Sequence, residues 1–310
     1  PRVQKMLWRP LIAAVCLLLI VACRKDTVGP TAIAGVVDLT GYDWSSGPLY
    51  LAGEWAFHWQ EWTPPEKPLS SGPFLKVPGP WNDFPVAGER VGGSGFATYR
   101  LKVILPENTP ALALRVGHFD SAYRLYIQND LRDSAGRPAT TAEESQAGRR
   151  PTVIHNLPEG GTFLITVQVS NHQHRNGGFP RALILGPADA VVHIQTTRTY
   201  ADLFLFGAII TIGLYHLGHF SFRRRDPAPF FFGVFCLLTA LRSELSGERA
   251  LVDFFQLHEY FTALYRLEYL SFFWSVPTFL AYTRAVFPSR FFPRYVLSAL
   301  TALTVLSTCI

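Results

Sequence analysis

One uninterrupted apolar segment constrains the fold of this chain more than any other feature. Residues 203–222 contain no Asp, Glu, Lys or Arg. A helix rises about 1.5 Å per residue, so about 20 such residues span the hydrocarbon core of a bilayer. We therefore predict a membrane helix over 203–222. The composition agrees, because only 16% of the residues are charged, against roughly 25% in globular proteins. This disfavours disorder and a water-soluble nucleic-acid binder.

Further apolar segments follow the first one. We predict a second helix over 227–241, a third over 261–287, and a fourth that begins near Tyr295 and is still apolar at Ile310. Together these segments predict an α-helical transmembrane bundle over residues 201–310, and we expect the chain to be a fragment that stops in its fourth helix.

Charge asymmetry between the loops predicts the orientation of the helices. The loops after the first and third helices are basic, with Arg223, Arg224 and Arg225 in one and Arg284, Arg290 and Arg294 in the other. The loop between the second and third helices is acidic, with Glu244, Glu248, Asp253 and Glu259 against Arg249. By the positive-inside rule the basic loops are cytoplasmic and everything before residue 201 is outside. The net charge of +5 then reflects topology rather than nucleic-acid affinity.

Three ionisable residues fall within or at the ends of these apolar segments: Arg242, Arg266 and Glu268. Charges there are costly, so each is a candidate functional residue. Arg266 and Glu268 are two positions apart and do not face each other on one helix. We predict an ion pair between Arg242 and Glu268, which joins the second and third helices, and expect Arg266 to face lipid headgroups.

The N-terminus is typical of a targeting segment. Lys5 and Arg9 precede an apolar run over 11–22 that is too short for an ordinary span. We predict a signal peptide over 1–23. The sequence Ile-Val-Ala-Cys that ends at Cys23 resembles a bacterial lipobox, and the alternative is an ordinary secretory signal cut nearby. No cysteine lies between Thr27 and Ala201, so no disulfide can support the exported region, which must be held together by its own core.

Between residues 33 and 189 the hydrophobic period is two. Trp55, Phe57 and Trp59 alternate with polar or small residues, and the same alternation recurs over 98–103, 112–116, 123–127 and 163–170. Turns rich in Pro and Gly separate these runs, and residues 140–150 form a polar loop. The pattern predicts an all-β antiparallel sandwich or barrel.

Several motifs of this β region resemble the galactose-binding-type jelly roll, which is also the N-terminal sandwich of some β-glycosidases. The motifs are Trp81, GFATYR at 95–100, YRLYIQN at 123–129, VQVSN at 167–171 and GGF at 177–179. The resemblance implies a jelly-roll sensor domain over 33–189. The catalytic carboxylates of those glycosidases belong to a separate barrel, for which this chain has no room.

By the same resemblance, loop residues at one edge of the sandwich bind a small-molecule or carbohydrate ligand, a polyol or an acidic sugar. We expect the convergence there of Trp81, Arg100, Asn171, His172 and Arg175. The indole would stack on the sugar, while the amide, imidazole and guanidinium groups would bind hydroxyls and a carboxylate. In the alternative interpretation Arg100 is the outward residue of a strand and Asn171 caps a turn.

Other chemistries find less support in the sequence. His172 and His174 lie on one side of an extended segment, but a tetrahedral zinc site needs three or four protein ligands, so we expect no metal and no cofactor. Glu54, Asp83 and Asp120, with Glu89, are the carboxylates that remain open for glycoside hydrolysis. No phosphate-binding or nucleophile motif occurs, and we expect no enzyme activity.

The helical region resembles a second family. The motifs DLFLFG at 202–207, LYHL at 214–217, FGVFCLL at 232–238, ALR at 240–242, GE at 247–248 and LEYLS at 267–271 are similar in order to those of bacterial seven-transmembrane receptors with diverse intracellular signalling modules. The resemblance covers residues 36–310. It implies seven helices followed by a cytoplasmic output module, such as a cyclase, kinase or phosphatase.

The resulting hypothesis is a sensory receptor of the bacterial inner membrane, multi-pass, with its N-terminal domain in the periplasm. Two alternatives are a membrane-tethered carbohydrate-binding module without a signalling role and a transporter. The expected partners are the ligand and membrane lipid, with no nucleic acid, and a homodimer through the membrane region is a further option.

Overall fold

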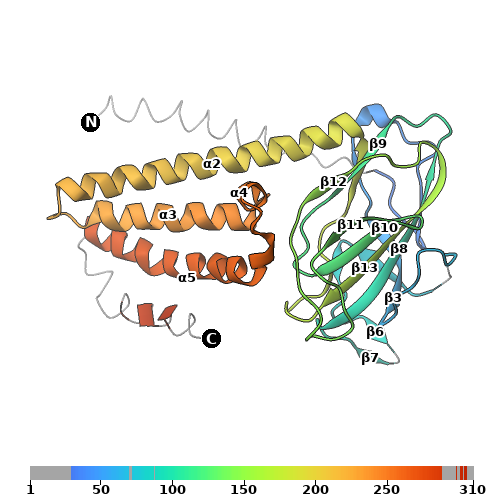
Figure 1. Cartoon of the computed structure of the whole chain (residues 1–310), viewed down its shortest axis with the longest axis horizontal. Helices are drawn as coiled ribbons and strands as arrows, with labels where there is room; N and C mark the ends of the chain where they lie inside the picture. The colour runs from blue at the N-terminus through green and yellow to red at the C-terminus, as the bar shows by residue number, and fades with distance from the viewer. Residues whose placement is uncertain are drawn as a thin grey trace.

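The computed structural model describes residues 29–69, 72–86, 88–287, 298, 301, 302, 304 and 305. The predicted signal peptide with Cys23, and most of the predicted fourth helix with Arg290 and Arg294, lie outside the described residues. A β domain and a bundle of helices lie end to end (Figure 1). The sequence prediction of antiparallel sheets followed by helices is confirmed, and the jelly-roll topology stays a prediction.

The larger sheet has seven strands in the order β11-β10-β13-β8-β3-β4, with β1 added parallel to β8. Its centre is the pair β8 (Gly95–Leu105) and β13 (Gly161–Asn171), which run antiparallel over eleven residues each. The other strands are β1 (Val36–Asp38), β3 (Gly53–Trp59), β4 (Phe74–Val77), β10 (Ala122–Ile127) and β11 (Asp130–Ala135).

The smaller sheet has the order β12-β9-β15-β2, and all of its pairs are antiparallel. Its strands are β2 (Leu49–Tyr50), β9 (Leu112–Val116), β12 (Thr152–Ile154) and β15 (Ile184–Pro187). Two short pairs complete the domain: β5 (Gly79–Pro80) with β14 (Gly178–Phe179), and β6 (Pro85–Val86) with β7 (Glu89–Arg90). A 3-10 helix, η1, covers Trp44–Ser46.

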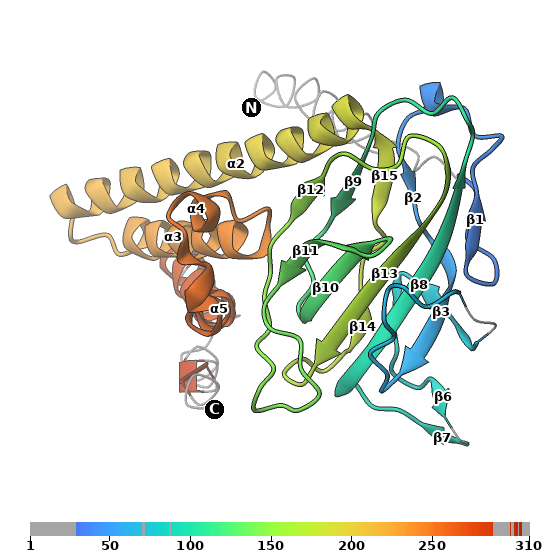
Figure 2. The same ribbon diagram turned by 45° about the vertical axis from the view of Figure 1, so that its right-hand side comes forward.

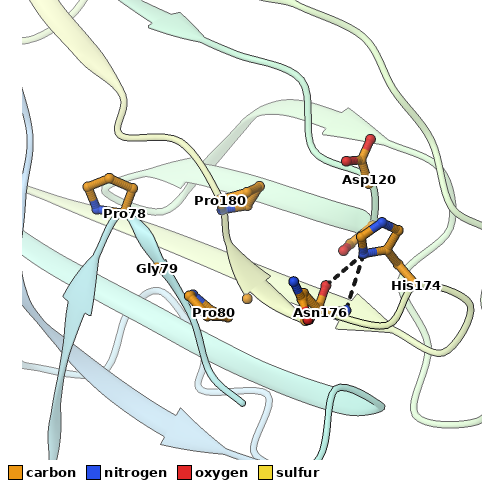
Figure 3. A pocket seen from close by; sticks show the side chains of 10 residues that line it. Pro78, Gly79, Pro80, Asp120, His174, Asn176 and Pro180 are labelled. Atoms are coloured by element: carbon orange, nitrogen blue, oxygen red, sulfur yellow. Dashed lines mark hydrogen bonds between the residues drawn. The ribbon is translucent and has the colours of Figure 1, made fainter. Parts of the chain in front are cut away.

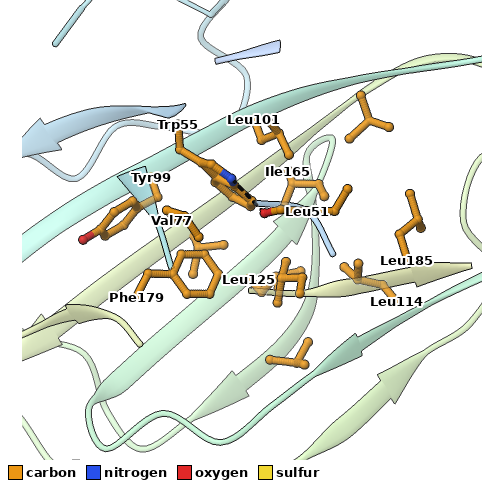
Figure 4. Close-up of a cluster of buried hydrophobic side chains, with 14 of the residues drawn as sticks. Leu51, Trp55, Val77, Tyr99, Leu101, Leu114, Leu125, Ile165, Phe179 and Leu185 are labelled. Atoms are coloured by element: carbon orange, nitrogen blue, oxygen red, sulfur yellow. Dashed lines mark hydrogen bonds between the residues drawn. The ribbon is translucent and has the colours of Figure 1, made fainter. Parts of the chain in front are cut away.

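The inward residues of the strands form one core (Figure 4). Phe179 belongs to this core, and the rings of Trp55 and Tyr99 lie 5.2 and 5.5 Å from its ring, in edge-on contact. The buried Trp55 indole donates to the Leu51 carbonyl at 3.2 Å, so its polar atom is satisfied, as buried polar atoms generally are.

The helices are α2 (Ala188–Phe222), α3 (Ala228–Ser246), α4 (Ala250–Phe254), the 3-10 helix η2 (Leu257–Tyr260) and α5 (Phe261–Val286). Among the described residues, α2 and α3 are long and apolar enough to cross a membrane, with mean hydropathies of 1.6 and 1.4. They meet through glycines: a Cβ on Gly233 would lie 2.9 Å from the Gly213 carbonyl. α5 packs against α3, with the rings of Phe235 and Phe279 5.1 Å apart.

The first helix begins much earlier than predicted. α2 starts at Ala188, directly after β15, rather than near residue 203. Its first turns carry Asp189, His193 and Arg198, so hydropathy marks only the later part of the helix. α3 likewise continues beyond residue 241 to Ser246. The predicted segment 261–287 coincides with α5.

Candidate ligand pocket and its junction with the helices

A loop over residues 172–177, between β13 and β14, is held in place by two asparagine side chains. The Asn171 amide donates to the carbonyls of His174 at 2.7 Å and Gly93 at 2.8 Å, and its oxygen accepts from the His174 N–H at 3.0 Å. Asn82 donates to the Arg175 carbonyl at 3.2 Å and accepts from the Gly177 N–H at 3.0 Å. Both amides therefore satisfy backbone groups and fix the shape of the loop.

This loop forms one wall of a cavity of about 300 Å³, at the small end of the range for ligand pockets. Figure 3 shows Asp120, His174 and Asn176 among its polar residues, together with three prolines. The complete lining consists of Pro78, Gly79, Pro80, Asp120, Ser121, His174, Asn176, Gly177, Gly178 and Pro180. A side chain at Gly177 would collide with the Trp81 indole, so this wall requires glycine.

Four of the five predicted ligand residues lie around Gly93 and Ser94, in the loop before β8. Trp81 donates its indole N–H to the Gly93 carbonyl at 3.1 Å, and Asn171 bonds to the same carbonyl. The His172 ring lies 3.2 Å from the Ser94 hydroxyl and 3.3 Å from the Ala139 carbonyl. Arg175 is exposed. None of the four lines the cavity.

Burial contradicts the predicted ligand-binding role of two of the five residues, Trp81 and Arg100. Trp81 is 0% exposed and belongs to the core, so no indole face is open for stacking on a sugar. Arg100 is also 0% exposed. Its guanidinium donates to the carbonyls of Pro65, Lys67 and Pro68 and to the Thr166 hydroxyl. It fastens a loop over β8 instead of meeting a ligand.

Asp120 is the pocket residue with the widest connections, and sequence reasoning considered it only for glycoside hydrolysis. It accepts from Arg149 through both Nε, at 2.7 Å, and Nη2. Arg149 also donates through Nη1 to the Glu268 carboxylate of α5 at 2.8 Å and to the Leu245 carbonyl of α3 at 3.2 Å. A single buried side chain thus joins the pocket to two helices.

A second ion pair lies in the same junction. Arg115 of β9 binds both oxygens of Glu248, at 2.6 and 2.8 Å, and donates to Gln195 of α2 at 2.6 Å. The Glu248 N–H in turn donates to Asp202 of α2 at 2.7 Å. The junction therefore unites β9, α2 and the segment between α3 and α4 (Figure 2). No sequence pattern pointed to Arg115 or Arg149.

The predicted ion pair between Arg242 and Glu268 is wrong. Arg242 donates to the backbone carbonyl of Glu268 at 3.3 Å and lies 4.5 Å from the centre of the Phe272 ring. The Glu268 carboxylate pairs with Arg149 of the β domain instead. Prediction within the helices failed because the partner belongs to the other domain. Arg266 is exposed, and its position at lipid headgroups stays a prediction.

Burial and charge shape the titration of this junction. Burial, together with the nearby Arg181 and Arg149, lowers the pKa of His118 to about 4. Burial alone would lower the pKa of Arg149, but Asp120 and Glu268 together hold it above its ordinary value. Within the described part of the chain, no group of three or more His, Cys, Asp or Glu residues is placed to hold a metal.

These features define a class: a membrane protein in which an antiparallel β domain with a small pocket is joined by buried ion pairs to apolar helices. Residues 198–310 match the family model described as 7TM diverse intracellular signalling. This helical part of the chain is therefore similar to that family, as its motifs predicted. That family implies a transmembrane sensory receptor.

Other comparisons concern curated proteins and solved structures. The search of curated proteins found no match. The chain is similar to a β-glucuronidase of Faecalibacterium prausnitzii, with 19% identity, a TM-score of 0.36, and coverage of 45% of this chain and 31% of that one. It is also similar to a β-glucuronidase of an uncultured Clostridium, with 19% identity, a TM-score of 0.37, and coverage of 46% of this chain and 29% of that one. A third similar structure is a Bifidobacterium dentium β-glucuronidase complexed with coumarin-3-O-glucuronide. Its identity is 16% and its TM-score 0.34, and the match covers 45% of this chain and 29% of that one. The match spans less than a third of each enzyme.

Proposed function

We propose that the chain is the sensing part of a receptor in the bacterial inner membrane, and that its β domain binds a small hydroxylated ligand of the carbohydrate class in the periplasm. The observation that carries the proposal is the double role of Asp120, which lines the pocket and also anchors the Arg149 bridge to α3 and α5. Occupation of the pocket therefore bears directly on a contact with the helices.

The lining of the pocket favours a neutral polyol over an acidic sugar. It offers one carboxylate, an imidazole, an amide and a hydroxyl, and it contains no Arg or Lys. These groups pair with sugar hydroxyls as donors and acceptors. The proline rings provide apolar surface for the C–H face of a sugar. A uronic acid would place its carboxylate beside Asp120, at the cost of like-charge repulsion.

The route of transmission follows from the shared carboxylate. A ligand hydroxyl that donates to Asp120 Oδ1 competes with the Arg149 guanidinium for that oxygen atom. A weaker hold by Asp120 frees Arg149 to strengthen its bond to Glu268 of α5, and charge-assisted bonds of this kind are strong where water is excluded. The ligand thereby shifts the balance between two arrangements of the junction.

The test is a glycan array probed with the full chain in lipid nanodiscs. We expect binding of neutral glycans, lost in His174→Ala, which removes the imidazole, and in Asp120→Asn, which replaces the charged carboxylate acceptor by an amide. Gln173→Ala changes an exposed residue of the same loop and is the matched control. Binding of an acidic sugar that Arg175→Ala abolishes would restore the site predicted from sequence. Equal binding by wild type and both pocket variants would refute this pocket.

A positive array must also produce a response in the helices. We expect the bound sugar to change hydrogen exchange of backbone amides near Glu268, where α5 meets Arg149. Binding with no change there would favour the tethered carbohydrate-binding module, and release of free sugar from a bound glycoside would indicate an enzyme instead.

A further inference from the structure

A second cavity lies at the seam between the β domain and the segment that leads into α5. Its volume is about 320 Å³. One wall comes from two β-domain segments, residues 134–137 and 146–150, and the other comes from Arg249, His258, Glu259 and Phe261. This cavity is separate from the proposed sugar pocket and shares no lining residue with it.

The lining is rich in guanidinium groups. Arg137, Arg149, Arg150 and Arg249 all contribute, against the single carboxylate of Glu259. Arg149 is committed to Asp120 and Glu268, and His258 is paired with Asp253 at 2.8 Å. Within the described part of the chain, the other three arginines have no carboxylate within 4.0 Å.

Arg249 is the most unusual of the three. It is 5% exposed, and its Nη1 donates to the Arg149 carbonyl at 3.4 Å. Its Nε finds no hydrogen-bond acceptor among the described residues. A buried charge normally has a counterion and a full set of hydrogen bonds, because it has lost those of water. The Arg249 guanidinium therefore has a buried donor left over for an acceptor in the cavity.

Backbone geometry brings the arginines to one rim. Arg137 and Gln146 exchange two backbone hydrogen bonds, at 2.7 and 3.0 Å. Behind them Gly136, at φ +67°, and Gly148 approach so closely that a Cβ on either would overlap the other segment. Side chains from two distant parts of the loop, Arg137 and Arg150, thus reach the same cavity as Arg249.

We propose that this cavity binds a phosphate-bearing anion, held by Arg137, Arg150 and Arg249. A phosphate group offers several strong acceptor oxygens to guanidinium forks, and the volume exceeds the needs of a lone carboxylate. Two sources share this chemistry: a free phosphate, and the headgroup of an anionic phospholipid beside the start of α5. The anion would fill the seam between the two domains and stiffen it. This proposal does not depend on the identity of the sugar.

The test uses the full chain in maltoside micelles free of phospholipid. Thermal unfolding is followed as inorganic phosphate replaces chloride at constant ionic strength, and separately as phosphatidylglycerol or uncharged diacylglycerol is added. A rise in Tm with inorganic phosphate supports a free anion. A rise only with phosphatidylglycerol supports a lipid headgroup. No rise with either refutes the site.

Variants connect the response to the cavity. Arg137→Gln and Arg249→Gln should each weaken the apparent affinity for the active probe about tenfold, the contribution of roughly one charge-assisted hydrogen bond. Arg90→Gln removes the same charge at an exposed site on β7 and should leave the affinity unchanged. Arg137 is exposed, so its variant decides the outcome even where Arg249→Gln does not fold. Wild-type affinity in Arg137→Gln would assign the ion to another place.

Discussion

The Arg149 guanidinium forms two ion pairs at the junction, one with the Asp120 carboxylate and one with the Glu268 carboxylate. Arg149→Met would leave two carboxylates poorly hydrated and without their cation. Breaking a buried pair in this way typically costs about 3–5 kcal/mol. We expect a clear fall in Tm in detergent.

A compensating variant separates charge from packing at this position. The triple change Arg149→Met, Asp120→Asn and Glu268→Gln removes the unpaired charges and should recover much of the lost stability. Arg90→Gln, an exposed ion-pair change, should have almost no effect. A single Arg149→Met variant as stable as the wild type would show that the bridge contributes nothing.

His118 predicts an acid-sensitive junction. Its pKa is about 4 in the folded protein, lowered by burial and by Arg181 and Arg149, against about 6.5 when unfolded. Between these values the unfolded chain binds the proton and the folded chain does not. The stabilising preference for neutral His118 is thus fully present above pH 6.5 and is lost as pH falls toward 4, by on the order of 1–3 kcal/mol. We expect His118→Gln to lose less stability than the wild type between pH 7 and pH 5, measured by thermal unfolding. Parallel curves would contradict this.

The alternation of apolar and polar residues correctly predicted which strand side chains point into the core. It did not predict that a loop covers part of the outer face of the larger sheet. Arg100 and Gln168 alternate with the core residues of β8 and β13, but the loop over residues 61–68 lies across them. Gln168 donates to the Thr63 carbonyl and Thr98 to the Glu61 carbonyl. Because a covering loop has no period of its own, the burial of Arg100 leaves no trace in the strand pattern.

Among the helices, the contact of α2 with α3 depends on two residues without side chains. A Cβ at Gly233 would lie 2.8 Å from Leu217 Cγ and 2.9 Å from the Gly213 carbonyl. Gly233→Ala should force the helices apart and cost about 1–3 kcal/mol. Gly218→Ala is the matched control, because nothing lies within 4 Å of that position, and it should be neutral or slightly stabilising. Equal Tm values for the two variants would argue against close packing here.

Hydropathy predicted the helices only where they are apolar. It recovered α5 almost to the residue and missed the first turns of α2 and the whole of α4. Those segments are amphiphilic: Gln195 and Asp202 of α2 bind the junction. Hydropathy cannot distinguish polar residues that contact another part of the protein from polar residues that face water.

For the whole molecule, charge asymmetry predicts the orientation. Arg223, Arg224 and Arg225 follow α2, so the far end of that helix should be cytoplasmic. Alkaline phosphatase fused after Thr197 should be active, and the same enzyme fused after Asp226 should be inactive. The opposite pattern would place the β domain in the cytoplasm.

The two halves could be recognised from the sequence, but their attachment could not. Arg115 meets Glu248 and Arg149 meets Glu268 across more than a hundred residues of chain. Each arginine is an unremarkable polar residue in its own segment. The role of Arg115 and Arg149 in joining the β domain to the helices becomes visible only in the folded structure of both parts.

The continuity of α2 has a mechanical consequence. From Ala188 to Phe222 the helix is 35 residues long, which is about 52 Å at about 1.5 Å per residue. It begins at the residue after β15, so we expect the strand and the helix to move together. A tilt of roughly 5° at the β15 end would displace the far end by about 4–5 Å. A small tilt where the helix leaves the β domain would therefore become a displacement of almost one helical turn at its far end.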